Sequence, residues 1–188
     1  GMDQADPAAV LAAYLQAHAQ GASSPAALFA KGEAVYERLR RDPPATGDWG
    51  RFRVAQGELA AESVGDAGLA TRYFRAALES VAKHGDHDVA ITAGFNQGVL
   101  HERRGNRALA AAAYAAAAGE GFRLQVASPS TLRAALASIR LAWDAEEKLN
   151  AEQRALLKQT WLTWLWLRAR QETLPDDLTS ELGRTLAA

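Results

Sequence analysis

Hydrophobic residues recur along most of this chain three and four positions apart, as they do on one face of an amphipathic helix. Near the N-terminus, one such face consists of Val10, Leu11, Tyr14 and Leu15. No segment keeps the alternation of apolar and polar residues that is typical of a strand. The pattern therefore predicts an all-α fold, with helices at 7–20, 25–40, 49–64, 67–84, 88–104, 107–118, 129–143 and 150–171, and a short one after Pro175.

The predicted helices have recognisable starts. Three begin with a capping side chain followed by proline: Asp6-Pro7, Ser24-Pro25 and Ser128-Pro129. Proline is favourable at the first helical position because its missing N–H would have no partner there. Asn150 and Gln153 resemble a capping box. The connections are short, so we expect neighbouring helices to pack antiparallel in a single domain over 1–188.

The alanine-rich segment 105–121 shares its spacing with an earlier part of the chain. The residues five, nine and twelve positions after Gly105 are Ala110, Tyr114 and Ala117. The residues at the same distances after Gly65, which lies 40 positions earlier, are Ala70, Phe74 and Ala77. Small side chains let helix backbones approach closely, and the aromatic ring fills the gap that remains. The segment is therefore interpreted as part of a repeat and not as low-complexity filler.

This pattern resembles the tetratricopeptide repeat (TPR), a helix–turn–helix unit of about 34 residues. The clearest repeats lie at about 51–85 and 91–120, and their spacing of 40 residues exceeds that of the family. The resemblance implies a TPR-like αα-superhelix of antiparallel helix pairs. In this interpretation, 7–42 and 129–172 are degenerate or capping helical pairs.

The match to the family is partial before each turn. Where the family has Trp, Leu and Tyr, the second repeat has Gly94, Gln97 and His101. The small residue seven positions before the turn is Gly98 in the second repeat, whereas Glu58 takes this position in the first. Longer helices would accommodate the extra length of the repeat.

In a TPR superhelix, the first helix of each pair lines a concave groove, and most members of the family bind peptides or partner helices. The resemblance thus implies a non-enzymatic protein-interaction module or adaptor. The residues expected to line its groove are Phe52, Ala55, Leu59, Glu62, Thr92, Phe95, Asn96, Val99, Glu102 and Arg103. In the alternative interpretation, Phe95 and Val99 only pack against the flanking helices.

Asn96 matches an asparagine with which chaperone-binding members of the family hold the C-terminal carboxylate of a peptide. The neighbouring lysine and the second asparagine of those members would fall on Ala55 and Leu59 here. Because neither residue is present, we do not expect carboxylate binding of this kind. A hydrophobic or helical ligand fits the predicted lining better.

Three tryptophans lie within six residues in "TWLTWLWLR". The face that this segment presents contains Trp161, Trp164 and Arg168, with Leu165 beside them. Tryptophan is enriched at interface hot spots, so a second hypothesis is a self-associating structural adaptor that dimerises through the helix 151–171. The alternative is a capping helix that closes one end of the superhelix.

Composition narrows the possible functions. The 188 residues include 21 basic and 22 acidic ones, for a formal net charge of −1, a balance that argues against nucleic-acid binding. Cysteine is absent, which excludes disulfides and cysteine-ligated zinc. No apolar run reaches the 18 residues of a membrane span. We expect a cytoplasmic protein that needs no cofactor.

The segment "HGDHD" contains two histidines and two aspartates: His84, Asp86, His87 and Asp88. These residue types can bind a metal ion, so a metal-dependent enzyme using His84 and His87 is a third hypothesis. The histidines lack the i,i+4 spacing of a helical metal motif, and no nucleotide-binding or hydrolase fingerprint occurs. We therefore expect a solvated turn, no metal site and no enzymatic activity.

Overall fold

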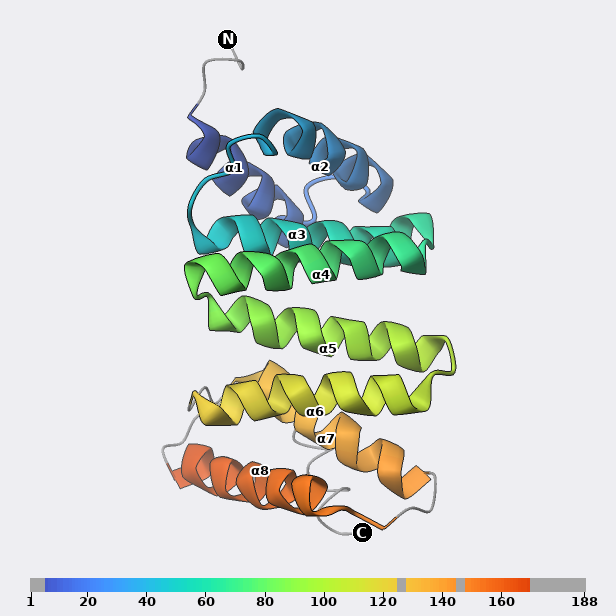
Figure 1. The fold of residues 1–188 in the computed structure, drawn as a ribbon. Helices are drawn as coiled ribbons and strands as arrows, with labels where there is room; N and C mark the ends of the chain where they lie inside the picture. The colour runs from blue at the N-terminus through green and yellow to red at the C-terminus, as the bar shows by residue number, and fades with distance from the viewer. Residues whose placement is uncertain (1–5, 125–127, 145–147, 170–188) are drawn as a thin grey trace. The chain divides into compact units, whose positions relative to one another are not determined.

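The computed structural model describes residues 6–124, 128–144 and 148–169, except for the side chains of 82, 84, 143, 144, 161 and 164–169. These residues form helices and no strand, which confirms the all-α prediction (Figure 1). The elements are α1 (Pro7–Gln20), α2 (Pro25–Leu39), α3 (Gly47–Leu59), the π-helix η2 (Ala60–Val64), α4 (Ala67–His84), α5 (His87–Arg103), α6 (Arg107–Arg123), α7 (Pro129–Asp144) and α8 (Ala151–Ala169). The predicted helix after Pro175 lies outside the described residues.

Local capping explains where several helices begin. Ser24 Oγ accepts a hydrogen bond from the backbone N–H of Ala27 at the start of α2. At the start of α8, the side chains of Asn150 and Gln153 each accept a hydrogen bond from the backbone N–H of the other residue. This reciprocal pair is a capping box. The starts of α2 and α8 that the sequence predicts thus rest on side-chain hydrogen bonds that satisfy the first N–H groups of these helices.

Helix α6 continues to Arg123, whereas the sequence pattern predicts its end near residue 118. The helix passes through Gly119 and through Gly121, which is buried. A Cβ atom on Gly121 would collide with the side chain of Thr131 at the start of α7. Glycine is therefore present here because α7 packs closely against α6, and it does not mark the end of the helix.

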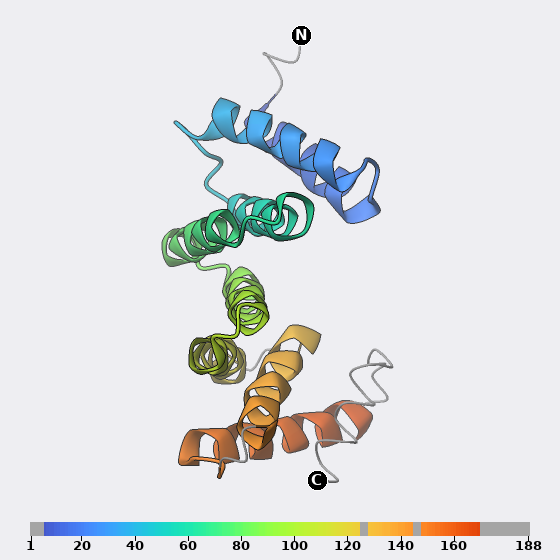
Figure 2. The ribbon, with the colours of Figure 1, turned by 90° about the vertical axis from the view of Figure 1, so that its right-hand side faces the viewer.

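Contacts divide the chain into two compact units, 1–93 and 94–188, with the boundary inside α5. In the first unit, α3 packs against α4, and α1 and α2 also contact α3. Figure 2 shows α3 and α4 nearly end-on and side by side. One cluster of the core joins α1, α2 and α3 and contains Leu11, Tyr14, Val35, Leu39, Phe52 and Ala55. The hydroxyl of Tyr14 donates a hydrogen bond to the Leu28 carbonyl at 2.9 Å, which satisfies this buried group.

In the second unit, α7 packs against α6 and α8. Figure 2 shows α7 crossing α8 rather than running along it. The contact surfaces are built mostly from alanine, with Tyr114, Leu141 and Leu156 as the larger buried side chains of their clusters. The alanine-rich sequence of α6 is therefore used for close packing of helices, because its small side chains bring the backbones together.

The two central helix pairs repeat one contact between a glycine and an aromatic ring. A Cβ atom on Gly57 in α3 would lie 2.5 Å from the ring of Phe74 in α4. A Cβ atom on Gly98 in α5 would likewise lie 2.5 Å from the ring of Tyr114 in α6. Both distances are too short for a real side chain, so each ring occupies space that only glycine leaves open. This recurrence is the structural counterpart of the sequence repeat.

The π-helix η2 shifts the alignment of the two repeats by one residue. Both turns use a glycine with positive φ, +70° at Gly65 and +76° at Gly105, but Gly57 precedes its turn by eight residues and Gly98 by seven. A π-helical turn holds more residues than an α-helical one, so η2 accommodates the additional residue. The small-residue position that the sequence comparison assigned to Glu58 therefore belongs to Gly57.

Candidate functional site

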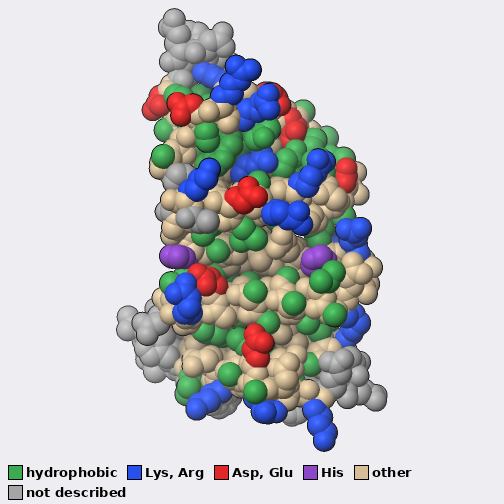
Figure 3. Space-filling view, viewed as in Figure 1, with side chains coloured by type: hydrophobic (Ala, Val, Ile, Leu, Met, Phe, Trp, Pro, Cys, Tyr) green, Lys and Arg blue, Asp and Glu red, His purple; other side chains and the backbone are tan. Residues whose placement is uncertain are grey.

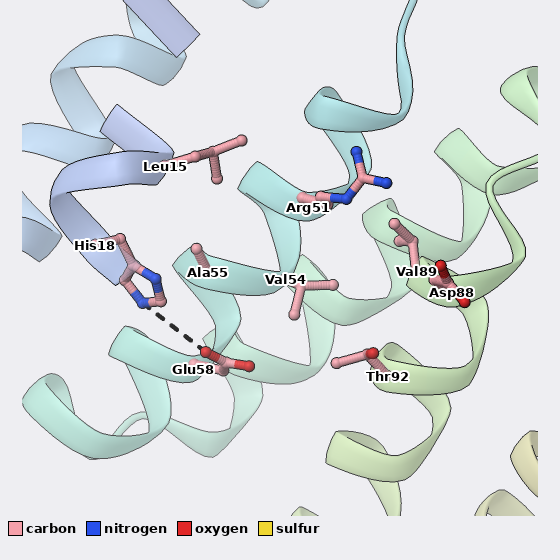
Figure 4. Close-up of a pocket in the computed structure, with 9 residues that line it drawn as sticks. All are labelled: Leu15, His18, Arg51, Val54, Ala55, Glu58, Asp88, Val89 and Thr92. Atoms are coloured by element: carbon pink, nitrogen blue, oxygen red, sulfur yellow. Dashed lines mark ion pairs between the residues drawn. The ribbon is translucent and has the colours of Figure 1, made fainter. Parts of the chain in front are cut away.

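A groove of about 320 Å³ lies in the first unit between α1, α3 and the beginning of α5 (Figure 4). Helix α3 contributes the most residues, at the i, i+3 and i+4 spacing of one helical face. The groove is lined by Leu15, His18, Arg51, Val54, Ala55, Glu58, Asp88, Val89 and Thr92. This volume is in the range of sites that hold one or a few side chains or a small ligand.

The middle of the groove is apolar and its two ends are polar. Val54 and Ala55 lie in the middle, between the polar ends (Figure 4). At one end, Nε2 of His18 lies 3.8 Å from a carboxylate oxygen of Glu58. At the other end, Arg51 of α3 and Asp88 of α5 both line the groove (Figure 4). An elongated ligand could therefore bury an apolar group between two polar contacts.

Carboxylates outnumber basic groups around this groove. Arg51 is held by two of them, through contacts of 2.9 Å to Asp48 and 2.7 Å to Asp86. Glu58 and Asp88 add two further acidic side chains to the lining. Four carboxylates thus surround one arginine and one histidine, and the local potential favours a positively charged partner.

Of the groove residues that the sequence predicts in the first unit, the structure brings Ala55 and Thr92 together in this groove. Phe52 is fully buried, where its ring meets Tyr14 edge-on at 5.3 Å between centroids. Leu59 is also buried, and Glu62 is exposed but lies outside the lining. None of these three residues is part of the groove lining, whose apolar members Val54, Ala55 and Val89 are themselves largely buried.

Sequence reasoning missed Arg51, Val54 and Glu58 because of the one-residue shift introduced by η2. With the repeats aligned on Gly57 and Gly98, these three residues correspond to Thr92, Phe95 and Val99. The same alignment pairs Phe52 with Ala93, and both are fully buried. Gly57 is the feature in the sequence that could have indicated the correct alignment.

The predicted groove residues of the second unit contact its other helices. The rings of Phe95 and Tyr114 meet at a tilt of 44° with 5.5 Å between their centroids, and Phe95 and Val99 pack against a cluster from α6 and α7. Both are partly buried, as is Asn96, while Arg103 is exposed. Phe95 and Val99 thus pack against the flanking helices, as the alternative interpretation expects. Part of each side chain remains accessible.

Glu102 is engaged by two neighbours in the second unit. It accepts hydrogen bonds from Arg140 at 3.0 Å and from the Tyr114 hydroxyl at 2.9 Å. The bond from Arg140 is the main reason that the pKa of Glu102 is lowered, and burial together with Glu102 raises the pKa of Tyr114. Glu102 therefore joins α5, α6 and α7 through charge-assisted hydrogen bonds.

The segment "HGDHD" forms the junction between α4 and α5 rather than a longer loop. Only Gly85, with φ of +71°, and Asp86 separate the two helices. Asp86 accepts a hydrogen bond from the N–H of Val89 at 3.4 Å and pairs with Arg51. Within the described residues, no three His, Cys, Asp or Glu side chains are grouped to hold a metal ion. The side chain of His84 lies outside the described residues.

The predicted self-association surface lies on α8. The side chains of Trp161, Trp164, Leu165 and Arg168 lie outside the described part of the structure. On the same helix, Leu162 is 47% exposed. The dimer therefore stays a prediction.

Charged and hydrophobic side chains are interspersed over the face shown in Figure 3. Among the described residues, no helix has both the length and the hydropathy needed to cross a membrane. Comparison with protein-family models, curated proteins and solved structures finds no match. The role of the site consequently rests on its geometry and chemistry.

Proposed function

We propose that this protein is a non-enzymatic interaction module, and that the groove between α1, α3 and α5 binds a peptide or a helix of a partner protein. The observation that carries this proposal is the apolar middle of the groove between two polar ends. This arrangement suits a side chain of a peptide that is anchored in the middle and oriented by polar contacts on either side.

A TPR-like architecture is part of this proposal. The contacts of Gly57 with Phe74 and of Gly98 with Tyr114 support it, since both come from equivalent positions in consecutive helix pairs. The groove lies on the first helix of one pair and the beginning of the next first helix, which is where a TPR-like protein binds its ligands.

The charges at the groove favour one class of peptide. Glu58 and Asp88 stand at opposite ends of the apolar middle, as Figure 4 illustrates. A peptide with an aliphatic residue flanked by lysine or arginine would place its apolar group on Val54 and Ala55 and a cation near each carboxylate. We therefore expect basic, aliphatic peptides to bind more tightly than acidic ones.

A displayed library of random peptides tests this proposal directly. Selection on the wild-type chain is expected to enrich aliphatic residues flanked by basic ones. Synthetic copies of the enriched peptides are then titrated against Glu58→Arg, which should weaken binding about tenfold because one attraction becomes a repulsion.

Glu62→Arg is the matched control, because it makes the same change one helical turn away and outside the groove. It should bind the peptides as wild type does, and circular dichroism should report the same helicity for both variants. Failure of any peptide to enrich, or equal binding to both variants, would remove this groove as the interaction site.

A further inference from the structure

A second cavity of about 410 Å³ lies in the first unit, among α2, the segment that follows it, α3 and α4. It shares no residue with the groove described above. Its lining consists of an aromatic wall, formed by Tyr36 and Trp49, and several charged side chains. The aromatic rings are nearly parallel, with 6.1 Å between their centroids.

Arg53 lines this cavity although its residue surface is only 7% exposed. Its guanidinium lies over the rings of Tyr36 and Tyr73, at 4.3 Å and 4.8 Å from their centroids. It donates one hydrogen bond, of 2.6 Å, to the side chain of Gln56. A guanidinium has five N–H donors, so most of the hydrogen-bonding capacity of Arg53 is not used by the described residues.

The nearest acidic neighbours of Arg53 do not neutralise it by direct contact. Glu33 accepts hydrogen bonds from Gln56 at 3.0 Å and from Tyr73 at 2.7 Å, and it forms no ion pair with Arg53. Glu79 stands on the lining of the cavity, also without an ion pair to Arg53. No carboxylate among the described residues therefore lies within ion-pair distance of this guanidinium, and burial lowers the pKa of Arg53.

A buried charge without an ionic partner is unfavourable, because the charge has lost its hydration and gains too little in return. The planar guanidinium is also the group best suited to two parallel hydrogen bonds with a carboxylate or a phosphoryl group. Two further cations, Arg40 and Lys83, are exposed at the same cavity, where Arg40 also pairs with Glu37 at 3.2 Å.

We propose that this cavity is a binding site for a small anionic molecule, whose phosphoryl or carboxylate group contacts Arg53 and whose planar body lies against Tyr36 and Trp49. The volume of the cavity is within the usual range for small-ligand sites. Lys83 attracts the anion at the entrance, and Arg53 provides the hydrogen bonds. This site is independent of the peptide groove.

Isothermal titration calorimetry with phenyl phosphate and benzoate tests the site and separates the two kinds of anion. Benzylamine, a cation with a similar ring, is the negative ligand. We expect at least one of the anions to bind at one site per chain and benzylamine not to bind. Arg53→Met should weaken anion binding about 10- to 100-fold, as expected for the loss of hydrogen bonds between charged groups.

Because Arg53 is buried, a second variant keeps the test valid if Arg53→Met does not fold. Lys83→Glu changes only an exposed side chain at the entrance and should weaken anion binding several-fold. Arg75→Glu is the matched control, since it reverses an exposed charge of the same helix outside the cavity. Two results would overturn the proposal: neither anion binds wild type at millimolar concentration, or Lys83→Glu binds as tightly as Arg75→Glu does.

The melting temperature of Arg53→Met without ligand gives a further readout. A merely structural arginine would stabilise the fold, and its loss would lower the melting temperature by many degrees. Removal of Arg53 relieves the cost of an unpaired buried charge, but it also leaves the buried Oε1 of Gln56 without its donor, so we expect Arg53→Met to melt within several degrees of wild type. A large decrease, together with unchanged anion affinity of Lys83→Glu, would assign Arg53 a structural role instead.

Discussion

At the residue scale, glycine and alanine decide how closely the helices pack. Gly57 and Gly98 face aromatic rings at distances that leave no room for a Cβ atom. Glycine lowers the stability of an isolated helix, so its presence inside α3 and α5 needs a reason from packing. The close approach of Phe74 and Tyr114 supplies that reason.

Gly98→Ala is expected to lower the free energy of unfolding by about 1–3 kcal/mol, because the new methyl group must displace Tyr114 from a packed contact. Gly119→Ala is the matched control, since this residue is exposed, lies in α6 and has no atom within 4 Å of the added Cβ. There the better helix propensity of alanine should raise stability by up to about 1 kcal/mol. Urea denaturation of both variants measures the difference, and a stabilising Gly98→Ala would contradict the repeated glycine–aromatic contact.

At the scale of elements, the π-helix η2 is the feature by which the first repeat differs from the second. The residues before the turn repeat after 41 positions and those after it repeat after 40, as Gly57 with Gly98 and Phe74 with Tyr114 show. The inserted residue is confined to a π-helical turn at the end of α3. The side of α3 that packs against α4 therefore keeps its regular α-helical spacing. The groove residues Arg51, Val54 and Glu58 depend on this alignment.

Deletion of Ala61 from η2 should convert the π-helical turn into a regular α-helical one, because Gly57 would then precede its turn by seven residues as Gly98 does. We expect stability within about 1 kcal/mol of wild type, since π-helical turns are less favourable than α-helical ones. Deletion of His101 from α5, at the equivalent place before Gly105, should cost about 3 kcal/mol or more, because it rotates the preceding helix by roughly 100°. Chemical denaturation that shows equal losses for the two deletions would argue against this role of η2.

At the scale of the whole molecule, the first unit carries two separate candidate sites of opposite character. The groove on α1, α3 and α5 is apolar with acidic ends, whereas the cavity beside Arg53 is aromatic and basic. The two sites require different ligands. Glu58→Arg changes only the groove, and Lys83→Glu changes only the cavity. Loss of one binding activity should therefore leave the other intact.

The hypothesis of self-association through 151–171 makes a prediction for the second unit. Static light scattering should then give a mass that rises from one to two chains with concentration, and Trp164→Ala should shift the rise to higher concentration. Leu109→Ala, which removes a side chain that is 56% exposed on α6, is the control. The mass of a single chain at all concentrations would exclude this hypothesis.

The sequence determined the helices, their capped starts and the recurring small and aromatic positions, because these depend on hydrogen bonds and packing between residues close in the chain. It did not determine where α6 ends. Gly121 lies within the helix, and its lack of a side chain leaves the space that Thr131 of α7 occupies. Nor did it determine the lining of the groove, because the π-helical turn at η2 shifts the alignment between α3 and α5 by one residue. The burial of Arg53 without an ion pair among the described residues was also decided only in the tertiary structure, where α2, α3 and α4 surround the cation and Glu33 accepts hydrogen bonds from Gln56 and Tyr73. Such features depend on which side chains meet across the fold, and spacing along one chain does not encode that directly.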